Sequence, residues 1–177
     1  ELEFIFNDAS IKIVFVSDKE LYDKVASVRS KTPSVQAVYS FNELSDVLHW
    51  KELLHTGTKE DLDKLASIKN AIRPEELATI LYTSGTTGFP KGVMLSHKNI
   101  MENVINVEEI VSEVANPSDR CLSFLPLNHI FERMVSYIYM YIGVSIYYAE
   151  SIDAVGDNLK EVKPTLFTTV PRLLEKV

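Results

Sequence analysis

The stretch "LYTSGTTGFPKGVMLSH", Leu81 to His97, is the most informative part of this sequence. It places glycines and hydroxyl side chains between two apolar runs and adds a proline and a lysine. Glycines can adopt positive φ and leave backbone amides uncovered, so such a chain can curl around an anion. Hydroxyl groups donate further hydrogen bonds, and Lys91 brings a mobile positive charge. The pattern therefore predicts a loop that binds phosphate groups, and ATP is the ligand that we expect.

This loop differs from two common phosphate-binding patterns. A Walker-type P-loop needs a Gly-Lys-Ser/Thr sequence after four intervening residues, whereas here Phe89 follows Gly88 and Gly92 follows Lys91. The dinucleotide fingerprint Gly-x-Gly-x-x-Gly does not occur in the chain. A flexible Ser/Thr/Gly hairpin with a chance lysine is the competing structural explanation.

Strand and helix patterns alternate on both sides of the loop. Short runs typical of strands lie at residues 11–18, 34–40, 77–83, 92–96, 120–127, 144–149 and 165–170. Helical spacing of apolar residues occupies 19–31, 42–54, 57–70, 97–115, 131–141 and 152–162, and another helix is expected from Pro171. Ser96 is a suitable N-cap for the helix that follows the loop. This alternation predicts an α/β fold, with a largely parallel sheet and helices on both faces.

Composition limits the classes of partner. The net charge of −7, from 18 basic and 25 acidic residues without a basic cluster, argues against nucleic acid as a partner. The single cysteine, Cys121, excludes an internal disulfide and favours a reducing compartment, which we take to be the cytoplasm. The longest apolar run, Met134 to Tyr148, is shorter than the roughly 20 residues of a membrane span, so no transmembrane segment is predicted. Peripheral membrane contact and the oligomeric state stay open.

Three segments carry a resemblance to a known family. "YTSGTTGFPKGVMLSHKNI", from Tyr82, is similar to the phosphate-loop signature of the adenylate-forming (AMP-binding) superfamily. "LSFLPLNHIFERM" (Leu122 to Met134) and "VKPTLFTTVPRLLEKV" (Val162 to Val177) resemble later segments of its long-chain fatty acyl-CoA synthetase branch. The resemblance identifies residues 1–177 as part of the large N-terminal, AMP-binding domain. Residues 71–76, around Pro74, are then an internal connection before the strand that enters the phosphate loop.

The resemblance implies a reaction and a set of binding residues. In this branch a fatty acid attacks ATP, assisted by Mg²⁺, to give an acyl-adenylate and pyrophosphate, and coenzyme A then takes the acyl group. The residues that the resemblance assigns to the β- and γ-phosphates are Thr83, Ser84, Gly85, Thr86, Thr87, Gly88 and Lys91.

His129 has two competing interpretations. The resemblance places it near the acyl pocket and the reacting carboxylate, whereas its position before a helical run also suits a helix cap. Glu132 and Arg133, one turn further on, are expected to pair with each other on that helix. The other histidines lack companions at metal-ligand spacing, so no metal site is expected from this chain alone.

The chain begins at Glu1 and ends at Val177 within a helical pattern, which indicates a piece of a longer protein. The family segments that hold adenine, ribose and the late catalytic lysine are absent from it, so we expect the fragment alone to be inactive. Two alternatives stay open: another adenylate-forming ligase, acting on aryl or amino acids, and a nucleotide-binding module without catalysis.

Overall fold

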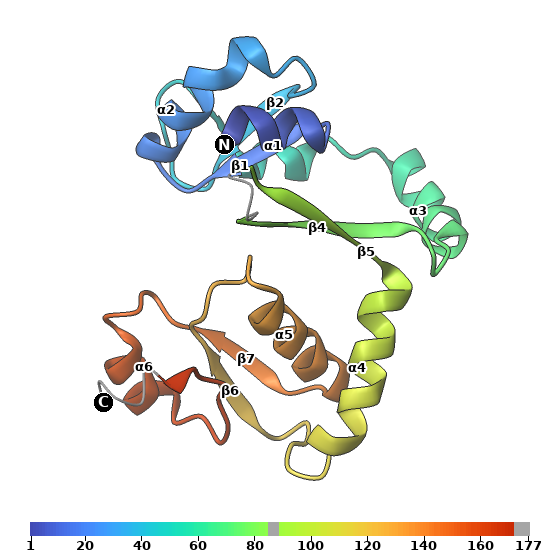
Figure 1. Ribbon diagram of the computed structural model, residues 1–177, viewed down its shortest axis with the longest axis vertical. Coiled ribbons are helices and arrows are strands. Elements are labelled where there is room, and N and C mark those ends of the chain that lie inside the picture. The colour runs from blue at the N-terminus through green and yellow to red at the C-terminus, as the bar shows by residue number, and fades with distance from the viewer. Residues whose placement is uncertain (85–88, 172–177) are drawn as a thin grey trace. The chain divides into compact units, whose positions relative to one another are not determined.

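The computed structural model describes residues 1–84 and 89–171, and Figure 1 draws its elements. The chain divides into two units, one built from residues 1–73 and 82–93 and the other from residues 74–81 and 94 onward. The elements of the first 73 residues are α1 (Leu2–Asp8), β1 (Ile13–Val16), α2 (Lys19–Val28), η1 (Arg29–Lys31), β2 (Ala37–Ser40), β3 (Leu48–His49), η2 (Trp50–His55) and α3 (Lys59–Ala71). η1 and η2 are 3-10 helices.

The first sheet is parallel, in the order β1-β2-β3. Residues alternate between the two faces of a strand, so Val14 and Val16 of β1 point to the same side. On that side they join a core with Phe6 of α1 and Val25 of α2. Helices α1 and α2 therefore cover one face of this sheet, and α1 was not expected from the sequence.

The helix predicted over residues 42–54 is wrong in its first half. The structure has a bend there, followed by the short strand β3 and the 3-10 helix η2. After β2 ends, Phe41 still lies beside β1, where its amide donates a hydrogen bond to the carbonyl oxygen of Val16 at 2.9 Å. Pairing of β3 with β2 then holds Leu48 and His49 extended. Non-local hydrogen bonds thus overrode a helical pattern that was apparent in the sequence.

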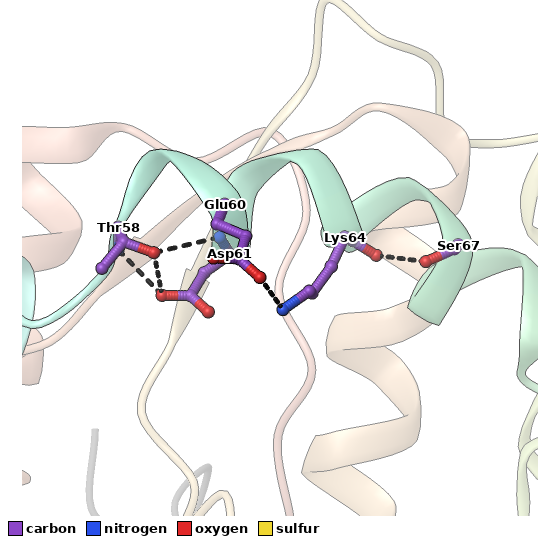
Figure 2. Close-up of polar contacts among 5 residues, drawn as sticks. All are labelled: Thr58, Glu60, Asp61, Lys64 and Ser67. Carbon is purple, nitrogen blue, oxygen red and sulfur yellow. Dashed lines mark hydrogen bonds and ion pairs between the residues drawn. The ribbon is translucent and has the colours of Figure 1, made fainter.

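Helix α3 forms at the predicted place, and local interactions stabilise it. Thr58 and Asp61 make a reciprocal capping box, which satisfies backbone amides at the helix N-terminus. Lys64, one turn after Glu60, forms an ion pair with the Glu60 carboxylate at 2.6 Å. Figure 2 draws both side chains. Every residue of the helix is exposed in this chain. Its stability within the chain therefore comes from caps and charge pairs rather than from a core.

The second part of the chain begins with β4 (Leu77–Thr83) and β5 (Lys91–Ser96), which form a two-stranded sheet. It continues with α4 (His97–Val111), β6 (Arg120–Ser123), α5 (Ile130–Ile142), β7 (Ser145–Tyr148) and α6 (Val155–Val162). β6 and β7 pair in parallel. The strand expected at 165–170 is reduced to a single parallel bridge between Leu166 and Cys121. The helix expected from Pro171 lies almost wholly outside the described residues.

Helices cover both faces of the β6–β7 sheet. Cys121 packs with Tyr139 and Ile142 of α5, and Ser123 bonds to the same helix. Leu122, between them, points to the opposite face and is 2% exposed. Helix α6 contacts β6, and its Val155 is also buried. The α/β class with parallel strand pairing is confirmed.

Gly143 ends helix α5. It has φ of 92°, a left-handed conformation that most side chains adopt only with strain. Its amide donates to the carbonyl oxygen of Tyr139 at 3.0 Å, which closes the last turn. The chain then reverses direction into β7, so the apolar run Met134 to Tyr148 is divided between a helix and a strand, as predicted.

Candidate functional site

Strands β4 and β5 bracket the predicted phosphate loop. β4 ends at Thr83 and β5 begins at Lys91, so the loop connects neighbouring strands of one sheet. The connection is too short for the crossover that parallel strands need, which makes the pair antiparallel. The loop therefore begins and ends at the same end of this two-stranded sheet.

The structure describes three of the seven residues assigned to phosphate binding. Thr83, Ser84 and Lys91 are all exposed. No ion pair joins the Lys91 ammonium to a carboxylate anywhere in residues 1–84 and 89–171. Its charge is thus available to an external anion. The other four, Gly85, Thr86, Thr87 and Gly88, lie outside the described residues.

Helix α1 contacts both sides of the loop, which sequence reasoning missed. Before the loop, the Tyr82 hydroxyl donates to the Asp8 carboxylate at 2.5 Å. After the loop, the ring centroid of Phe89 lies 5.9 Å from that of Phe4. The hydrogen bond to Asp8 raises the pKa of Tyr82 to about 12. Both contacts join residues more than 70 positions apart, so no local pattern could have indicated them.

His129 is the N-cap of α5. Its Nδ1 accepts a hydrogen bond from the backbone amide of Phe131 at 3.3 Å. The capping interpretation is therefore confirmed, while the role near a substrate carboxylate stays a prediction. Because Nδ1 acts as the acceptor, the neutral ring carries its proton on Nε2. The side chain is exposed, so that Nε2–H group is able to donate to an external oxygen.

Glu132 and Arg133 do not pair with each other, contrary to expectation. Glu132 is 3% exposed, and its Oε1 accepts from the buried hydroxyl of Ser123 at 2.5 Å. Arg133 donates from Nε to the carbonyl oxygen of Leu127 at 3.3 Å and from Nη1 to Thr79 Oγ1 at 2.8 Å. Adjacent residues on a helix point about 100° apart, which explains why each finds a partner of its own.

The described residues form neither a cluster of metal-ligand side chains nor a membrane-spanning helix. Among the described residues, no three side chains of the His, Cys, Asp and Glu types gather as metal ligands would. Carboxylates and phosphate oxygens are the usual ligands of Mg²⁺. No described helix is both long enough and apolar enough to cross a bilayer.

The model of the AMP-binding enzyme family matches residues 1–177, the whole chain. Long chain acyl-CoA synthetase 4 of Arabidopsis thaliana is 32% identical over 192 residues, which cover 99% of this chain and 28% of the plant protein. Long-chain-fatty-acid–CoA ligase 5 of Mus musculus is 33% identical over 187 residues, covering 98% of this chain and 27% of the mouse protein. The chain thus spans less than a third of the length of these relatives.

Two solved structures of ligases are also similar to this chain. A long-chain-fatty-acid-CoA ligase (FadD1) from Archaeoglobus fulgidus superposes with a TM-score of 0.75 and 27% identity, over 98% of this chain and 33% of that one. ATP-bound MatB from Rhodopseudomonas palustris superposes with a TM-score of 0.68 and 25% identity, over 99% of this chain and 33% of that one.

Proposed function

The chain belongs to the AMP-binding enzyme family, and we propose that it is the part of a fatty acid–CoA ligase that binds the polyphosphate of ATP. One observation carries the proposal: Thr83 and Ser84, where β4 ends, and Lys91, where β5 begins, have exposed side chains on the two sides of the loop. Relatives named long-chain acyl-CoA synthetases and ligases support fatty acids as the substrate class. The resemblance to a relative solved with ATP supports the nucleotide.

The proposed reaction has two halves. A carboxylate oxygen of the acid attacks the α-phosphorus of ATP, the bond to the bridging oxygen breaks, and pyrophosphate leaves with that electron pair. The thiol of coenzyme A then attacks the acyl carbon, AMP leaves, and the thiol proton is released. Charge builds up on phosphate oxygens in the first half, which is where fixed donors lower the barrier.

The residues of this chain act on the phosphates and on the reacting oxygens. The Thr83 and Ser84 hydroxyls and the Lys91 ammonium donate to the β- and γ-phosphates, together with Gly85 to Gly88. The Nε2–H group of His129 donates to an oxygen of the reacting carboxylate or of the α-phosphate. Mg²⁺ belongs to the expected ATP complex, and its carboxylate ligands come from outside this chain.

The test is a pyrophosphate-exchange assay on the full-length protein with a panel of fatty, aryl and amino acids. We expect exchange with long-chain fatty acids, and we expect Lys91→Met to lower it by about 100-fold, a loss of about 3 kcal/mol of transition-state stabilisation. Lys64→Met is the matched control, because it removes an exposed lysine whose partner is Glu60 on α3. Exchange confined to aryl or amino acids would identify the other type of ligase. ATP binding without any exchange would identify a non-catalytic module.

A further inference from the structure

Glu132 is a buried acidic residue in the first turn of α5. It is 3% exposed, and its Oε1 accepts a hydrogen bond from the Ser123 hydroxyl at 2.5 Å. Ser123 is the last residue of β6 and is 7% exposed. Both groups of this hydrogen bond are therefore withdrawn from solvent, and both belong to the same unit of the chain.

The second carboxylate oxygen of Glu132 has no partner in the described part of the chain. Oε2 is also buried, yet no group in residues 1–84 or 89–171 donates a hydrogen bond to it. A carboxylate offers about four lone-pair sites, and the hydroxyl of Ser123 fills only one of them. Burial removes the water that would otherwise solvate the group, so a carboxylate here is destabilising unless other donors replace that water.

Local electrostatics compensate the charge of Glu132 only in part. The N-terminus of α5 favours an acidic side chain in its first turn, but a helix end is equivalent to roughly half an elementary charge. The Ser123 hydroxyl is a neutral dipole. Burial first and then the charge of Glu132 raise the pKa of the neighbouring Cys121 thiol, so this negative charge acts on the groups around it.

The described cations of this unit have other partners. Arg133, the next residue of α5, uses its Nε and Nη1 for hydrogen bonds to other groups. Arg120, at the start of β6, donates to a backbone carbonyl oxygen. Lys98 and Lys160 pair with carboxylates on their own helices. Within the described residues, no ion pair includes Glu132.

We propose that Glu132 is the buried half of an ion pair, whose other half is an arginine or lysine outside the described residues that donates to Oε2. Such a cation supplies both a donor and the opposite charge, whereas a backbone amide or a water molecule supplies only the donor. Relatives are more than three times as long as this chain, so most residues of such a protein lie outside it. Neither the phosphate loop nor a substrate takes part in the pair, which is therefore independent of the proposed function.

The direct test is a crystal structure of the full-length protein without ligands. We expect a guanidinium or ammonium nitrogen within about 4 Å of Glu132 Oε2, the usual limit for an ion pair. A water molecule, a backbone amide or bulk solvent at Oε2 in place of a cation would overturn the proposal. A protein that has this ion pair and activates no acid would contradict the proposed function alone.

Thermal unfolding of the full-length protein tests the same pair in solution. Glu132→Gln keeps the size of the side chain and one acceptor oxygen but removes the charge, which leaves the buried cation unpaired. We expect it to lower the melting temperature by at least about 3 °C more than Glu60→Gln does. Glu60→Gln is the matched control, because it makes the same change in the exposed pair with Lys64. An equal effect of the two substitutions would overturn the proposal.

Two further comparisons separate a buried pair from other causes of instability. The difference in melting temperature between wild type and Glu132→Gln should persist in 1 M NaCl, because salt screens a buried pair little. Once the structure identifies the cation, its replacement by Met combined with Glu132→Met should be less destabilising than the sum of the two single changes. Loss of the difference in salt, or strictly additive effects, would overturn the proposal. If Glu132→Gln fails to fold, the wild-type structure still decides.

Discussion

At the scale of single residues, the side chains that flank the two predicted sites are more constrained than the sequence suggested. Tyr82 and Phe89 contact α1, and Arg133 contacts both Leu127 and Thr79. The sequence motifs identified Thr83, Ser84, Lys91 and His129 as candidate site residues. It could not predict these partners, because they come from segments far away in sequence, such as Thr79, which lies 54 residues before Arg133.

Cys121 gives a prediction that depends on pH. It is fully buried, and burial first and then the nearby Glu132 charge raise the pKa of its thiol to about 11. Relative to the ordinary value of 9.0, this lowers the thiolate fraction near pH 8 by about 100-fold. We expect iodoacetamide to label Cys121 at least 100-fold more slowly in the native protein than in urea. Peptide mapping by mass spectrometry measures this, and equal labelling rates would show that Cys121 is not buried.

The same shift predicts the direction of a stability change. The thiol pKa is higher in the folded state, so the stability that it contributes is present below pH 9 and is lost as the pH rises through 11. Cys121→Ala should therefore unfold with a weaker dependence on pH than wild type between these values. Thermal melts at several pH values test this, and parallel curves for the two proteins would contradict it.

At the scale of elements, the sequence predicted most helices and strands because their signals are local. Ser96 caps α4 as expected, and Gly143 separates α5 from β7. Two failures have a common cause. The helix expected at 42–54 gave way to pairing with β2, and the strand expected at 165–170 makes only one bridge to β6. In both cases the outcome depends on the neighbouring strand, which a local pattern does not encode.

The cap of α4 gives a prediction about stability. Ser96 accepts a hydrogen bond from the amide of Asn99 at 3.2 Å, and Asn99 bonds back to the amide of Ser96 at 3.0 Å. Ser96→Ala should destabilise the protein by about 1 kcal/mol, the usual cost of losing such a cap. The control is Ser67→Ala, whose hydroxyl donates to the carbonyl oxygen of Lys64 on exposed α3. Urea unfolding of the full-length variants should place the midpoint of Ser96→Ala lower. A midpoint at or above that of Ser67→Ala would contradict the capping role.

At the scale of the whole molecule, the first sheet has an open apolar face. The ring of Phe15 stacks on Tyr39 at 5.7 Å and on Phe41 at 5.8 Å between centroids. Phe15 and Phe41 are nonetheless 46% and 54% exposed. Relatives of the chain are more than three times as long. These features fit a chain that carries part of a larger domain, as the resemblance in the sequence implied.

We therefore predict that the chain of 177 residues does not form acyl-CoA on its own. It supplies the proposed phosphate loop and His129, and the proposed reaction also needs groups that bind adenine and the metal. The measurement is thioester formation by the purified fragment with ATP, Mg²⁺, a long-chain fatty acid and coenzyme A. Circular dichroism of the same sample establishes that it is folded. Product above the level without enzyme would contradict this division of the site.

The most direct test of the whole account is a crystal structure of the full-length protein with a non-hydrolysable ATP analogue. The account predicts that the β- and γ-phosphates lie within hydrogen-bond distance of the segment from Thr83 to Lys91, with the Lys91 ammonium among the donors. An analogue whose phosphates bind elsewhere, with this segment making no contact to them, would contradict it.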